Sequence, residues 1–331
     1  MTEQPPSPPV RATIVMYHYV RRTIAARFPR LPALDVERFR GQLDYIRKHY
    51  SPVALMDVAD AARGERTLPP RPIVLTFDDG YADHYRDAWP LLRSAGVPAT
   101  FFLVSSSLIG RRMLDVNRIQ FVLAAADSPE PIVRIIEEAI VDSAGRADVR
   151  SIDDYRAAGW KAVRYDSAPI SYVKYLLQGA LPEELRASVL DALFARFVSS
   201  DERAFAEELY LGVPQALDMI EQGAGIGCHA GRHLTLTSLS RDEQAREIDG
   251  ALRVLDALAL PRSPFVFSYA KGAHNADSID LLGARGCTLA VTNRPDIAGV
   301  PPNALLALPR LDTNHLPTDG DAPPNEWTRR A

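Results

Sequence analysis

The stretch that decides the fold and the chemistry is Ile73–Tyr85, IVLTFDDGYADHY. Apolar and β-branched residues lead up to Phe77, as in a buried strand, and Asp78, Asp79 and Gly80 follow at once. Two neighbouring negative charges repel each other, and a plain turn requires only one aspartate. The pair therefore indicates a metal ion or a shared proton, and its partners have to come from elsewhere in the chain.

Length and composition indicate an ordinary soluble globular protein. The chain has 331 residues, of which 47% are hydrophobic and 24% are charged, enough apolar mass for one large core or two moderate ones. The formal net charge is -4, so no basic surplus marks nucleic acid or an anionic membrane as a partner. The two cysteines, Cys228 and Cys287, imply no disulfide framework and are consistent with a reducing compartment.

The sequence shows neither a secretion signal nor a membrane span. Its first residues, MTEQPPSPPV, are polar and proline-rich and lack the basic start and apolar run of a signal peptide. A span would need a run of about 18 apolar residues, and the sequence contains none. We therefore expect a soluble protein located in the cytoplasm.

Strands alternate with helices along most of the chain. Residues 12–20 and 72–77 have the composition of buried strands, and residues 35–50 place apolar side chains at helical spacing. This alternation predicts an α/β protein with parallel strands, whose ligands gather at the carboxyl ends of the strands.

Three segments depart from this alternation. Residues 1–11 predict a disordered leader, because prolines and polar residues offer nothing to bury. Residues 110–212 contain several helical patterns and no convincing strand. They predict one long helical insertion, either a packing or oligomer surface or a lid that shapes the substrate site. Residues 313–331 are rich in proline and polar residues and are expected to form a loose tail. A single α/β domain is thus predicted over 12–312.

A second motif supplies partners for the two aspartates. The segment IGCHAGRH places His229 and His233 four residues apart, just after a short apolar strand. On one helical turn this spacing points both imidazoles in the same direction, toward one divalent ion. One carboxylate and two histidines, with further positions open to water, are typical of catalytic rather than structural metal sites. One aspartate can then be a ligand and the other a base.

Together, TFDDG at 76–80 and GCHAGRH at 227–233 resemble the motifs of the polysaccharide deacetylase family of metal-dependent carbohydrate esterases. The surrounding sequence is similar too. IVMYHYV resembles the family's opening strand, FSYAKG stands where a segment like Phe-Ala-Tyr-Pro-Tyr-Gly is usual, and LPRLD resembles a late motif of one subgroup. The resemblance covers about residues 12–110 and 213–313. It implies a distorted (β/α) barrel of the deacetylase type, interrupted by the helical insertion.

The resemblance assigns roles to the first two motifs. Asp78 would be the general base, and Asp79, His229 and His233 would bind one divalent metal ion. Zinc (Zn2+) is the first expectation for such a donor set, and Co2+, Ni2+, Mn2+ and Fe2+ stay open. The implied reaction is hydrolysis of an acetamide by water that the metal activates, with Asp78 taking its proton. Family members usually carry Ser or Thr where this chain has Ala230, so a hydroxyl that stabilises this loop is missing.

The third motif would bind the substrate. By position, the backbone N–H of Lys271 is the expected donor to the oxyanion, and Tyr269, Gly272 and His274 are expected as substrate contacts beside it. This motif departs from the family pattern, in which proline or aromatic residues stand at the positions of Ala270 and Lys271.

Two further roles fall on residues outside these motifs. Three histidines are candidates for the acid that protonates the leaving amine, His18 at the end of the first strand, His274 and His315, and the sequence does not choose among them. Arg310 and Asp312, in LPRLD, are expected to form a pair that orients the base.

These features predict a metal-dependent hydrolase that removes an N-acetyl group from an acetamido sugar. A cytoplasmic location favours an activated or nucleotide-linked sugar, or a glycan precursor of surface polysaccharide. Two alternatives stay open: hydrolysis of a non-sugar amide such as a formamide, ureide or cyclic amide, and a catalytically weak binding protein on the same fold. The acetylated sugar is the expected partner, and a homo-oligomer formed through the helical insertion is a further prediction.

Overall fold

The computed structural model describes residues 10–24, 26–146, 148–163, 166–300 and 304–331. Most of the expected leader, 1–11, lies outside these residues, but Val10 and Arg11 belong to the first strand, so the prediction is wrong for these two residues. The strands are β1 (Val10–Tyr17), β2 (Val20–Arg21), β3 (Leu34–Asp35), β4 (Ser51–Pro52), β5 (Pro72–Phe77), β6 (Ala99–Leu103), β7 (Gly225–Cys228), β8 (Phe265–Ser268), β9 (Cys287–Val291), β10 (Ala298–Val300) and β11 (Leu311–Asp312).

Nine of these strands form one sheet. Its main path runs β10-β1-β5-β6-β7-β8-β9. Outside that path, β11 pairs with β1 and β4 pairs with β5. Every pairing is parallel except that of β1 with β10. The predicted α/β class with parallel strands is confirmed. Parallel strands bring their carboxyl ends to one edge, so the residues that follow β1, β5, β7 and β8 lie close together in space.

The strands are buried on both faces. Along β5, Ile73, Leu75 and Phe77 belong to one buried apolar cluster, while Val74 belongs to a second. Side chains of successive strand residues point to opposite faces, so the two clusters lie on the two sides of the curled sheet. Continuous apolar burial of this kind is typical of parallel strands covered on both sides, and it explains why TIVMY and PIVLTF show no polar alternation.

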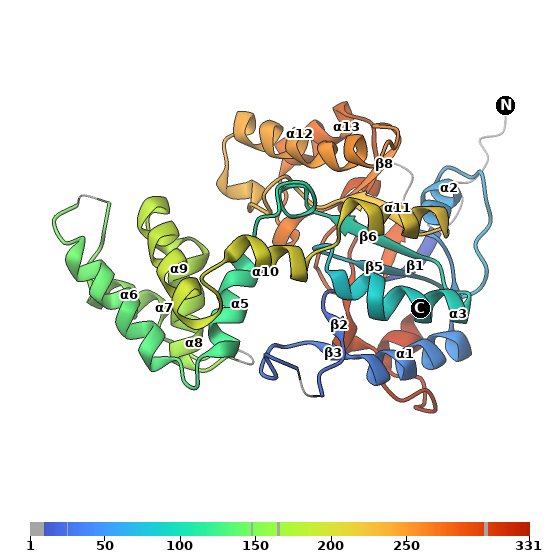
Figure 1. The fold of residues 1–331 in the computed structure, drawn as a ribbon. Coiled ribbons are helices and arrows are strands. Elements are labelled where there is room, and N and C mark those ends of the chain that lie inside the picture. Colours follow the sequence, from blue (N-terminus) through green and yellow to red (C-terminus); the bar gives the residue numbers. More distant parts are fainter. Residues whose placement is uncertain (1–9, 25, 147, 164–165, 301–303) are drawn as a thin grey trace. The chain divides into compact units, whose positions relative to one another are not determined.

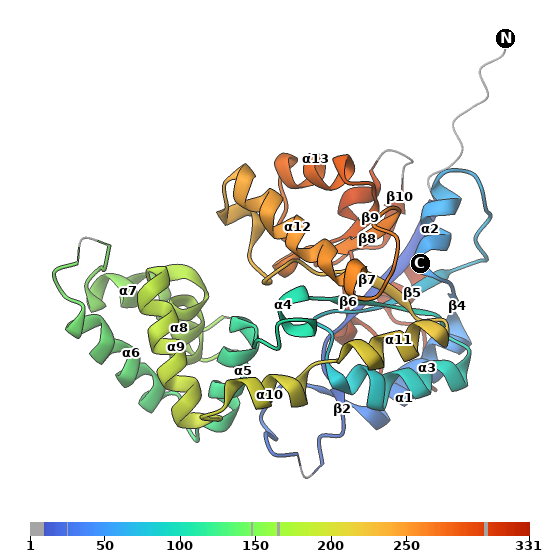
Figure 2. The same ribbon diagram turned by 45° about the horizontal axis from the view of Figure 1, so that its top comes forward.

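Contacts divide the chain into two compact units. The first consists of Met1–Thr23, Ala33–Arg111 and Glu207–Ala331, and the second of Ile24–Pro32 and Arg112–Ala206. The first unit contains the nine-stranded sheet, and Figures 1 and 2 show α12 and α13 running side by side over it. Its helices are α1 (Val36–His49), α2 (Leu55–Ala62), α3 (Trp89–Ala95), α4 (Ser105–Leu108), α11 (Val213–Glu221), α12 (Arg241–Ala257), α13 (Ala276–Ala284) and α14 (Glu326–Arg330), with short π or 3-10 turns η1 (His84–Ala88), η3 (Leu236–Ser238), η4 (Ala270–Gly272), η5 (Leu305–Ala307) and η6 (Thr313–His315).

The second unit is helical. It contains α5 (Asp115–Ala125), α6 (Glu130–Asp142), α7 (Ile152–Gly159), α8 (Ala168–Tyr175), the π turn η2 (Leu176–Ala180) and α9 (Glu183–Phe197), and α10 (Glu202–Leu209) leads out of it. The predicted insertion at 110–212 overlaps this unit. The unit also takes in residues 24–32, which sequence periodicity did not assign to it, because the ring of Phe28 packs edge-on against Phe121 and Phe205 at 5.1 and 5.9 Å.

The C-terminal tail is ordered, so the expectation of a loose segment over 313–331 is wrong. The buried amide of Gln42 on α1 donates to the carbonyl oxygens of Thr313 (2.9 Å) and Leu316 (3.1 Å). Gly41 lets the tail approach closely, since a Cβ there would lie 2.1 Å from the carbonyl oxygen of Thr318. Composition misleads here because the polar groups of the tail are satisfied by polar groups of a helix rather than by water.

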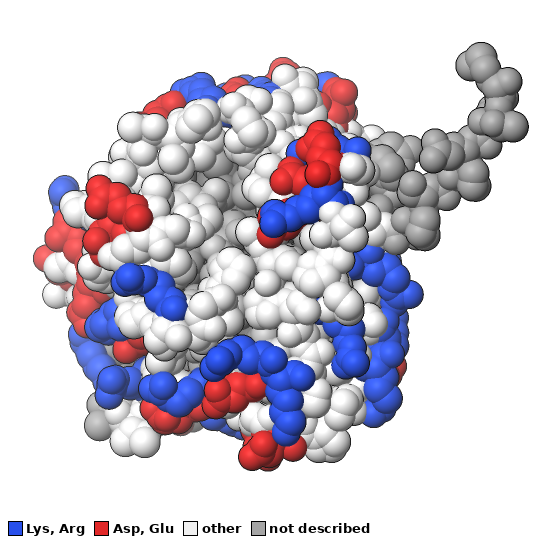
Figure 3. Space-filling model, turned by 90° about the vertical axis from the view of Figure 1, so that its right-hand side faces the viewer, with Lys and Arg blue, Asp and Glu red and all other residues white. Residues whose placement is uncertain are grey.

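No helix within the described ranges is long and apolar enough to cross a membrane. On the face shown in Figure 3, acidic side chains lie beside many of the basic ones.

Candidate metal centre

The two aspartates of TFDDG follow β5 and point to different partners. The N–H of Asp78 continues the strand pairing by donating to the carbonyl oxygen of Tyr17 (2.9 Å). The backbone then turns sharply, because Asp79 and Gly80 have φ angles of 73° and 71°. A left-handed φ is unfavourable for an aspartate, and such backbone strain is concentrated at functional sites. The turn points the two carboxylates toward different partners, and this reduces the repulsion between two negative charges that follow one strand.

The two histidines converge through a loop, not a helical turn, so that part of the sequence interpretation is wrong. His229 follows β7 directly, and its N–H donates to the carbonyl oxygen of Leu103 on β6 (2.8 Å). Ala230 and His233 both have left-handed φ angles, 66° and 63°. These two reversals bring the imidazoles together, with ring centroids 4.8 Å apart.

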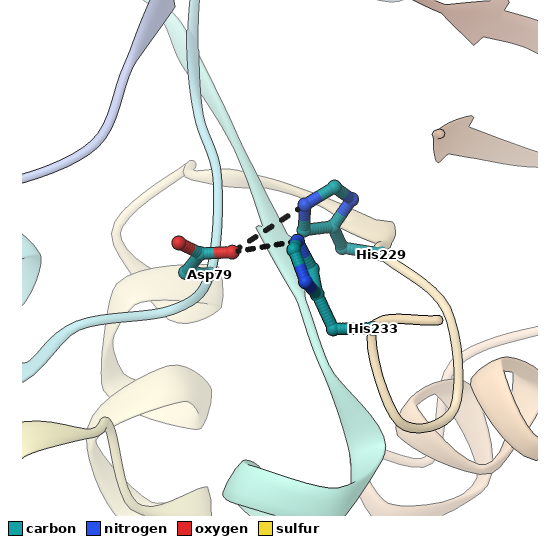
Figure 4. A group of neighbouring side chains, drawn as sticks. All are labelled: Asp79, His229 and His233. Carbon is teal, nitrogen blue, oxygen red and sulfur yellow. Dashed lines mark ion pairs between the residues drawn. The ribbon is translucent and has the colours of Figure 1, made fainter. Parts of the chain in front are cut away.

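Asp79, His229 and His233 form one cluster at the carboxyl edge of the sheet (Figure 4). Oδ1 of Asp79 lies 3.4 Å from Nε2 of His229 and 3.5 Å from Nε2 of His233. The three ligand atoms lie within 4.8 Å of one another. Among the described residues, this buried Oδ1 has no hydrogen-bond partner. A buried acceptor facing two ring nitrogens fits a cation shared by all three.

The electrostatics of the cluster also fit a cation. Burial alone would lower the pKa of His229, but the carboxylates of Asp78 and Asp79 raise it above its ordinary value. Burial lowers the pKa of His233 to about 4, so this imidazole is neutral at pH 7 and can act as a ligand. The Nδ1 of His229 bonds to the carbonyl oxygen of Ser268 (2.7 Å), which leaves Nε2 as the ligand atom.

Asp78 is held by a buried arginine. Arg310 donates from Nη1 to Oδ1 of Asp78 (2.9 Å) and from Nη2 to Oδ2 (2.6 Å). Its other N–H groups reach the carbonyl oxygen of Thr292 and the hydroxyls of Thr76 and Ser268. Burial alone would raise the pKa of Asp78, but the charges of Arg310 and His229 lower it to about 2. Asp78 is therefore an ionised carboxylate in a fixed orientation beside the cluster.

A family model described as polysaccharide deacetylase matches residues 65–127 and 197–290. Both matched segments contain a motif of the cluster, TFDDG in the first and GCHAGRH in the second. These two segments form a polysaccharide deacetylase domain within the chain.

Known polysaccharide deacetylases are similar in sequence over short segments. The poly-beta-1,6-N-acetyl-D-glucosamine N-deacetylase of Escherichia coli K12 is 35% identical over 78 residues, which are 23% of this chain and 12% of that protein. The chain covers no more than 34% of the length of the curated relatives it matches.

Solved deacetylase structures share the fold over most of this chain. The deacetylase PplD of Streptococcus pyogenes, solved in complex with acetate, superposes with a TM-score of 0.55 over 92% of each chain at 18% identity. The de-N-acetylase of Aggregatibacter actinomycetemcomitans superposes with a TM-score of 0.52 over 95% of this chain and 97% of its own, at 16% identity. The prediction of a distorted (β/α) barrel of the polysaccharide deacetylase type is confirmed.

The third motif lies next to the cluster, but only part of it is exposed. Lys271 is exposed and has a left-handed φ of 55°, and its charge contributes to the low pKa of His233. Tyr269 is buried, and its hydroxyl donates to the carbonyl oxygen of Leu306 (2.8 Å). The expectation that the Tyr269 side chain contacts substrate is therefore wrong. Gly272 and His274 are half-buried, and Nδ1 of His274 bonds to the carbonyl oxygen of Gly272 (3.0 Å).

The structure separates the three candidate acids. The charge of His18 lowers the pKa of both Asp78 and Asp79, so its ring lies within electrostatic reach of the site. His315 instead accepts through Nδ1 from the backbone N–H of Asp312 (3.1 Å). The main influences on the pKa of the two aspartates include His18 but neither His274 nor His315. Among the three, His18 is placed best.

The predicted Arg310–Asp312 pair is not formed. Oδ1 of Asp312 accepts from the backbone N–H of Asn314 (2.9 Å) and from its side-chain amide (2.6 Å), capping η6. Arg310 reaches Asp78 without it. The family resemblance suggested the pair, but the two side chains have different partners: Arg310 meets Asp78, and Asp312 caps η6.

Two residues that no sequence motif marked also orient the site. The hydroxyl of Tyr81 donates to Oδ2 of Asp79 (2.5 Å), leaving Oδ1 toward the histidines. Ser268 contacts both halves of the site, with its hydroxyl 3.2 Å from Oδ2 of Asp78 and its carbonyl oxygen on His229. Tyr81 lies two residues after Asp79 in the segment Ile73–Tyr85, so its position in the sequence could have indicated a contact with Asp79. No neighbouring motif marks Ser268 in this way.

Replacing Tyr81 by phenylalanine is expected to weaken divalent-metal affinity by about 10-fold, because a second partner that orients a metal ligand is lost. The ring should keep its stacking on Tyr19, whose centroid is 4.0 Å away, so the fold should persist. Competition with a chromophoric chelator measures the affinity. Tyr85→Phe, which removes a phenol that meets Asp218 outside the cluster, is the matched control, and equal affinities in all three proteins would contradict the assignment.

Proposed function

We propose that this chain is a metal-dependent hydrolase that removes N-acetyl groups from an acetamido sugar. The observation that carries the proposal is the pairing of two groups at one edge of the sheet: a three-residue cluster of metal donors, and beside it an ionised carboxylate clamped by Arg310. Oδ2 of Asp78 lies 4.0 Å from Nε2 of His229, so base and donors can act on one substrate group. The polysaccharide deacetylase domain supports the same reaction class.

Asp79, His229 and His233 would hold the metal. Nitrogen and carboxylate donors suit Zn2+ first, and Co2+, Ni2+, Mn2+ and Fe2+ remain compatible. A divalent cation in such a site polarises an amide carbonyl and acidifies water.

The protein's own residues then divide the proton transfers. Asp78, ionised at neutral pH, takes a proton from the water whose oxygen forms the new bond to the acetyl carbon. The backbone N–H at Lys271 is the expected donor to the carbonyl oxygen as it gains charge. His18 delivers a proton to the sugar nitrogen as the C–N bond breaks. The products are acetate and the free amino sugar, so atoms and protons balance.

The substrate is proposed from two sources. The named activity of the Escherichia coli relative makes β-1,6-linked N-acetylglucosamine oligomers the first substrate to assay. An activated or nucleotide-linked N-acetyl sugar, or another glycan precursor, is the second, and it depends on the proposed cytoplasmic location. Acetate release from both classes, measured with zinc-loaded and chelator-treated protein, tests the function. Release from neither class in the loaded protein would overturn it.

Replacing Arg310 is expected to move the acid limb of the pH–rate profile to higher pH. Burial raises the pKa of Asp78, and the charge of the Arg310 guanidinium is the largest influence that lowers it. Without the guanidinium the pKa of Asp78 should therefore rise from about 2. The reaction needs the ionised carboxylate, and activity is therefore lost at a pH below the raised pKa. We expect Arg310→Met to shift the limb by one pH unit or more, roughly the effect of one neighbouring opposite charge, and Arg310→Lys to shift it less.

Profiles of kcat/KM against pH measure this shift in both variants. The control is Arg262→Lys, at an exposed pair with Asp256. An unchanged acid limb in folded Arg310→Met would show that Arg310 does not govern the charge of Asp78.

We also propose that the helical unit forms a homo-oligomer. A hollow of about 640 Å³ on its surface is lined by Val133, Val141, Ile152 and Trp160 among charged residues. Val141 and Trp160 are 58% and 39% exposed, an apolar surface that association would cover. Molar mass from light scattering tests this proposal, and a monomer at assay concentration would overturn it.

A further inference from the structure

The loop that carries both histidines has an unfavourable backbone conformation. It contains two non-glycine residues with left-handed φ angles, Ala230 and His233, and each costs free energy that neighbouring contacts must offset. Ala230 offers no side-chain hydrogen bond, so the loop cannot be held from within at that position. Support for His233 has to come from outside the loop.

That support comes from Glu247 on α12. Its carboxylate is buried, and Oε1 accepts from the backbone N–H of Arg232 (2.6 Å) and of Leu234 (3.2 Å). These are the residues on either side of His233. Two N–H groups aimed at one carboxylate oxygen fix the peptide planes that flank the ligand.

The loop and α12 also pack at close range. A Cβ on Gly231 would lie 3.0 Å from the carbonyl oxygen of Glu247 and 3.1 Å from its Oε2. The carbonyl oxygen of Gly231 accepts from the N–H of Ser106 (2.9 Å) and the hydroxyl of Ser105 (3.1 Å). The loop is thus held on one side by α4 and on the other by Glu247.

The ion pair between Glu247 and Arg232 is long and solvent-exposed, so the Glu247 carboxylate interacts mainly with the backbone of the loop. Nε of Arg232 lies 3.6 Å from Oε2, and its side chain is 65% exposed to solvent. A buried carboxylate is costly without hydrogen bonds, and most of those available to Glu247 come from the loop backbone.

We propose that Glu247 is a positioning residue for the metal centre: it holds the backbone on both sides of His233 so that the imidazole faces Asp79 and His229. This inference rests on the proposed metal-dependent function. It concerns the preorganisation of a ligand and adds a residue, 14 positions beyond His233 in the chain, that none of the three motifs contains.

Two substitutions separate length from charge. Glu247→Gln keeps an acceptor oxygen at the same distance but removes the charge, and Glu247→Asp keeps the charge but withdraws it by one methylene. We expect Glu247→Gln to bind Zn2+ within about threefold of the wild type and Glu247→Asp to bind it about 10 to 100-fold more weakly, the range for lost outer partners of metal ligands. Chelator competition without substrate gives the affinities.

Glu243→Ala is the matched control. Glu243 lies one turn earlier on α12 and accepts from the N–H and hydroxyl of Ser240 (2.8 Å each), so its loss weakens the helix but leaves the hydrogen bonds between Glu247 and the loop in place. Its Zn2+ affinity should equal that of the wild type. The visible spectrum of the Co2+-loaded proteins adds a readout of coordination geometry, which should change in Glu247→Asp only.

Three results would overturn the proposal: wild-type affinity in Glu247→Asp, an equal loss in Glu243→Ala, or a loss in Glu247→Gln with none in Glu247→Asp, which would indicate a charge effect instead. These outcomes are distinct from failure of the proposed function. A wild-type protein that binds Zn2+ but releases no acetate refutes the deacetylase activity and leaves the role of Glu247 to be decided by the affinities.

Discussion

Asp78→Asn is expected to lower kcat for acetate release by about 1,000-fold, the middle of the range for loss of a general base, while leaving the metal bound. The amide cannot take a proton from water at neutral pH. The three metal donors are other residues, Asp79, His229 and His233, so stoichiometry by elemental analysis should stay at that of the wild type. KM should change little, since the substitution alters the transition state more than ground-state binding.

The same variant distinguishes a base from a structural anchor. Removing the Asp78 charge leaves the buried guanidinium of Arg310 without its bidentate partner, so some loss of stability is expected as well. Melting curves must therefore accompany the rates. Asp321→Asn, at an exposed pair with Lys48, is the control. A folded, metal-loaded Asp78→Asn protein with full activity would exclude Asp78 as the base.

His229→Ala is expected to abolish both metal binding and activity. The side chain is only 2% exposed, and its Nε2 lies 3.4 Å from Oδ1 of Asp79, so no neighbouring group can replace it. A ligand that binds only the folded state stabilises it by about 2.7 kcal/mol at 100 times its Kd. Zn2+ should therefore raise the Tm of the wild type and leave that of the variant unchanged.

The melting experiment carries its own control. His49→Ala removes a histidine in the last turn of α1, outside the cluster, and should keep the full zinc-dependent rise in Tm. Zinc that raised the Tm of His229→Ala as much as that of the wild type would place the metal elsewhere. No rise in any of the three proteins would remove the basis for a metal-dependent hydrolase.

The fold was largely predictable because its strands are continuous apolar runs. PIVLTF is buried along its whole length, and its helical neighbours show clear spacing, so the α/β class and the edge that collects the site followed from periodicity. The inclusion of residues 24–32 in the helical unit was not predictable, because it depends on Phe28 meeting rings about 90 and 180 positions away. The ordered tail was missed for a similar reason: its polar groups pair with Gln42.

The metal donors were found because both motifs are local in sequence. What sequence could not supply is how they are held. The histidines converge through left-handed residues instead of a helical turn, and Ser268, Tyr81 and Glu247 support them through contacts that spacing does not encode. Arg310 was expected to act together with Asp312, yet it reaches Asp78 alone. Predicted roles of Asp78 and His18 stay predictions until the variants are measured.

The clamp on Asp78 has a consequence for biosynthesis. Arg310 lies 232 positions after Asp78, the residue whose carboxylate it binds, and it directly precedes β11. A ribosome has therefore produced both motifs with their metal donors well before it produces the guanidinium. Until then the nascent barrel contains a carboxylate that burial pushes toward its neutral form. A chain made only as far as residue 309 therefore contains the metal donors but lacks the group that keeps Asp78 ionised.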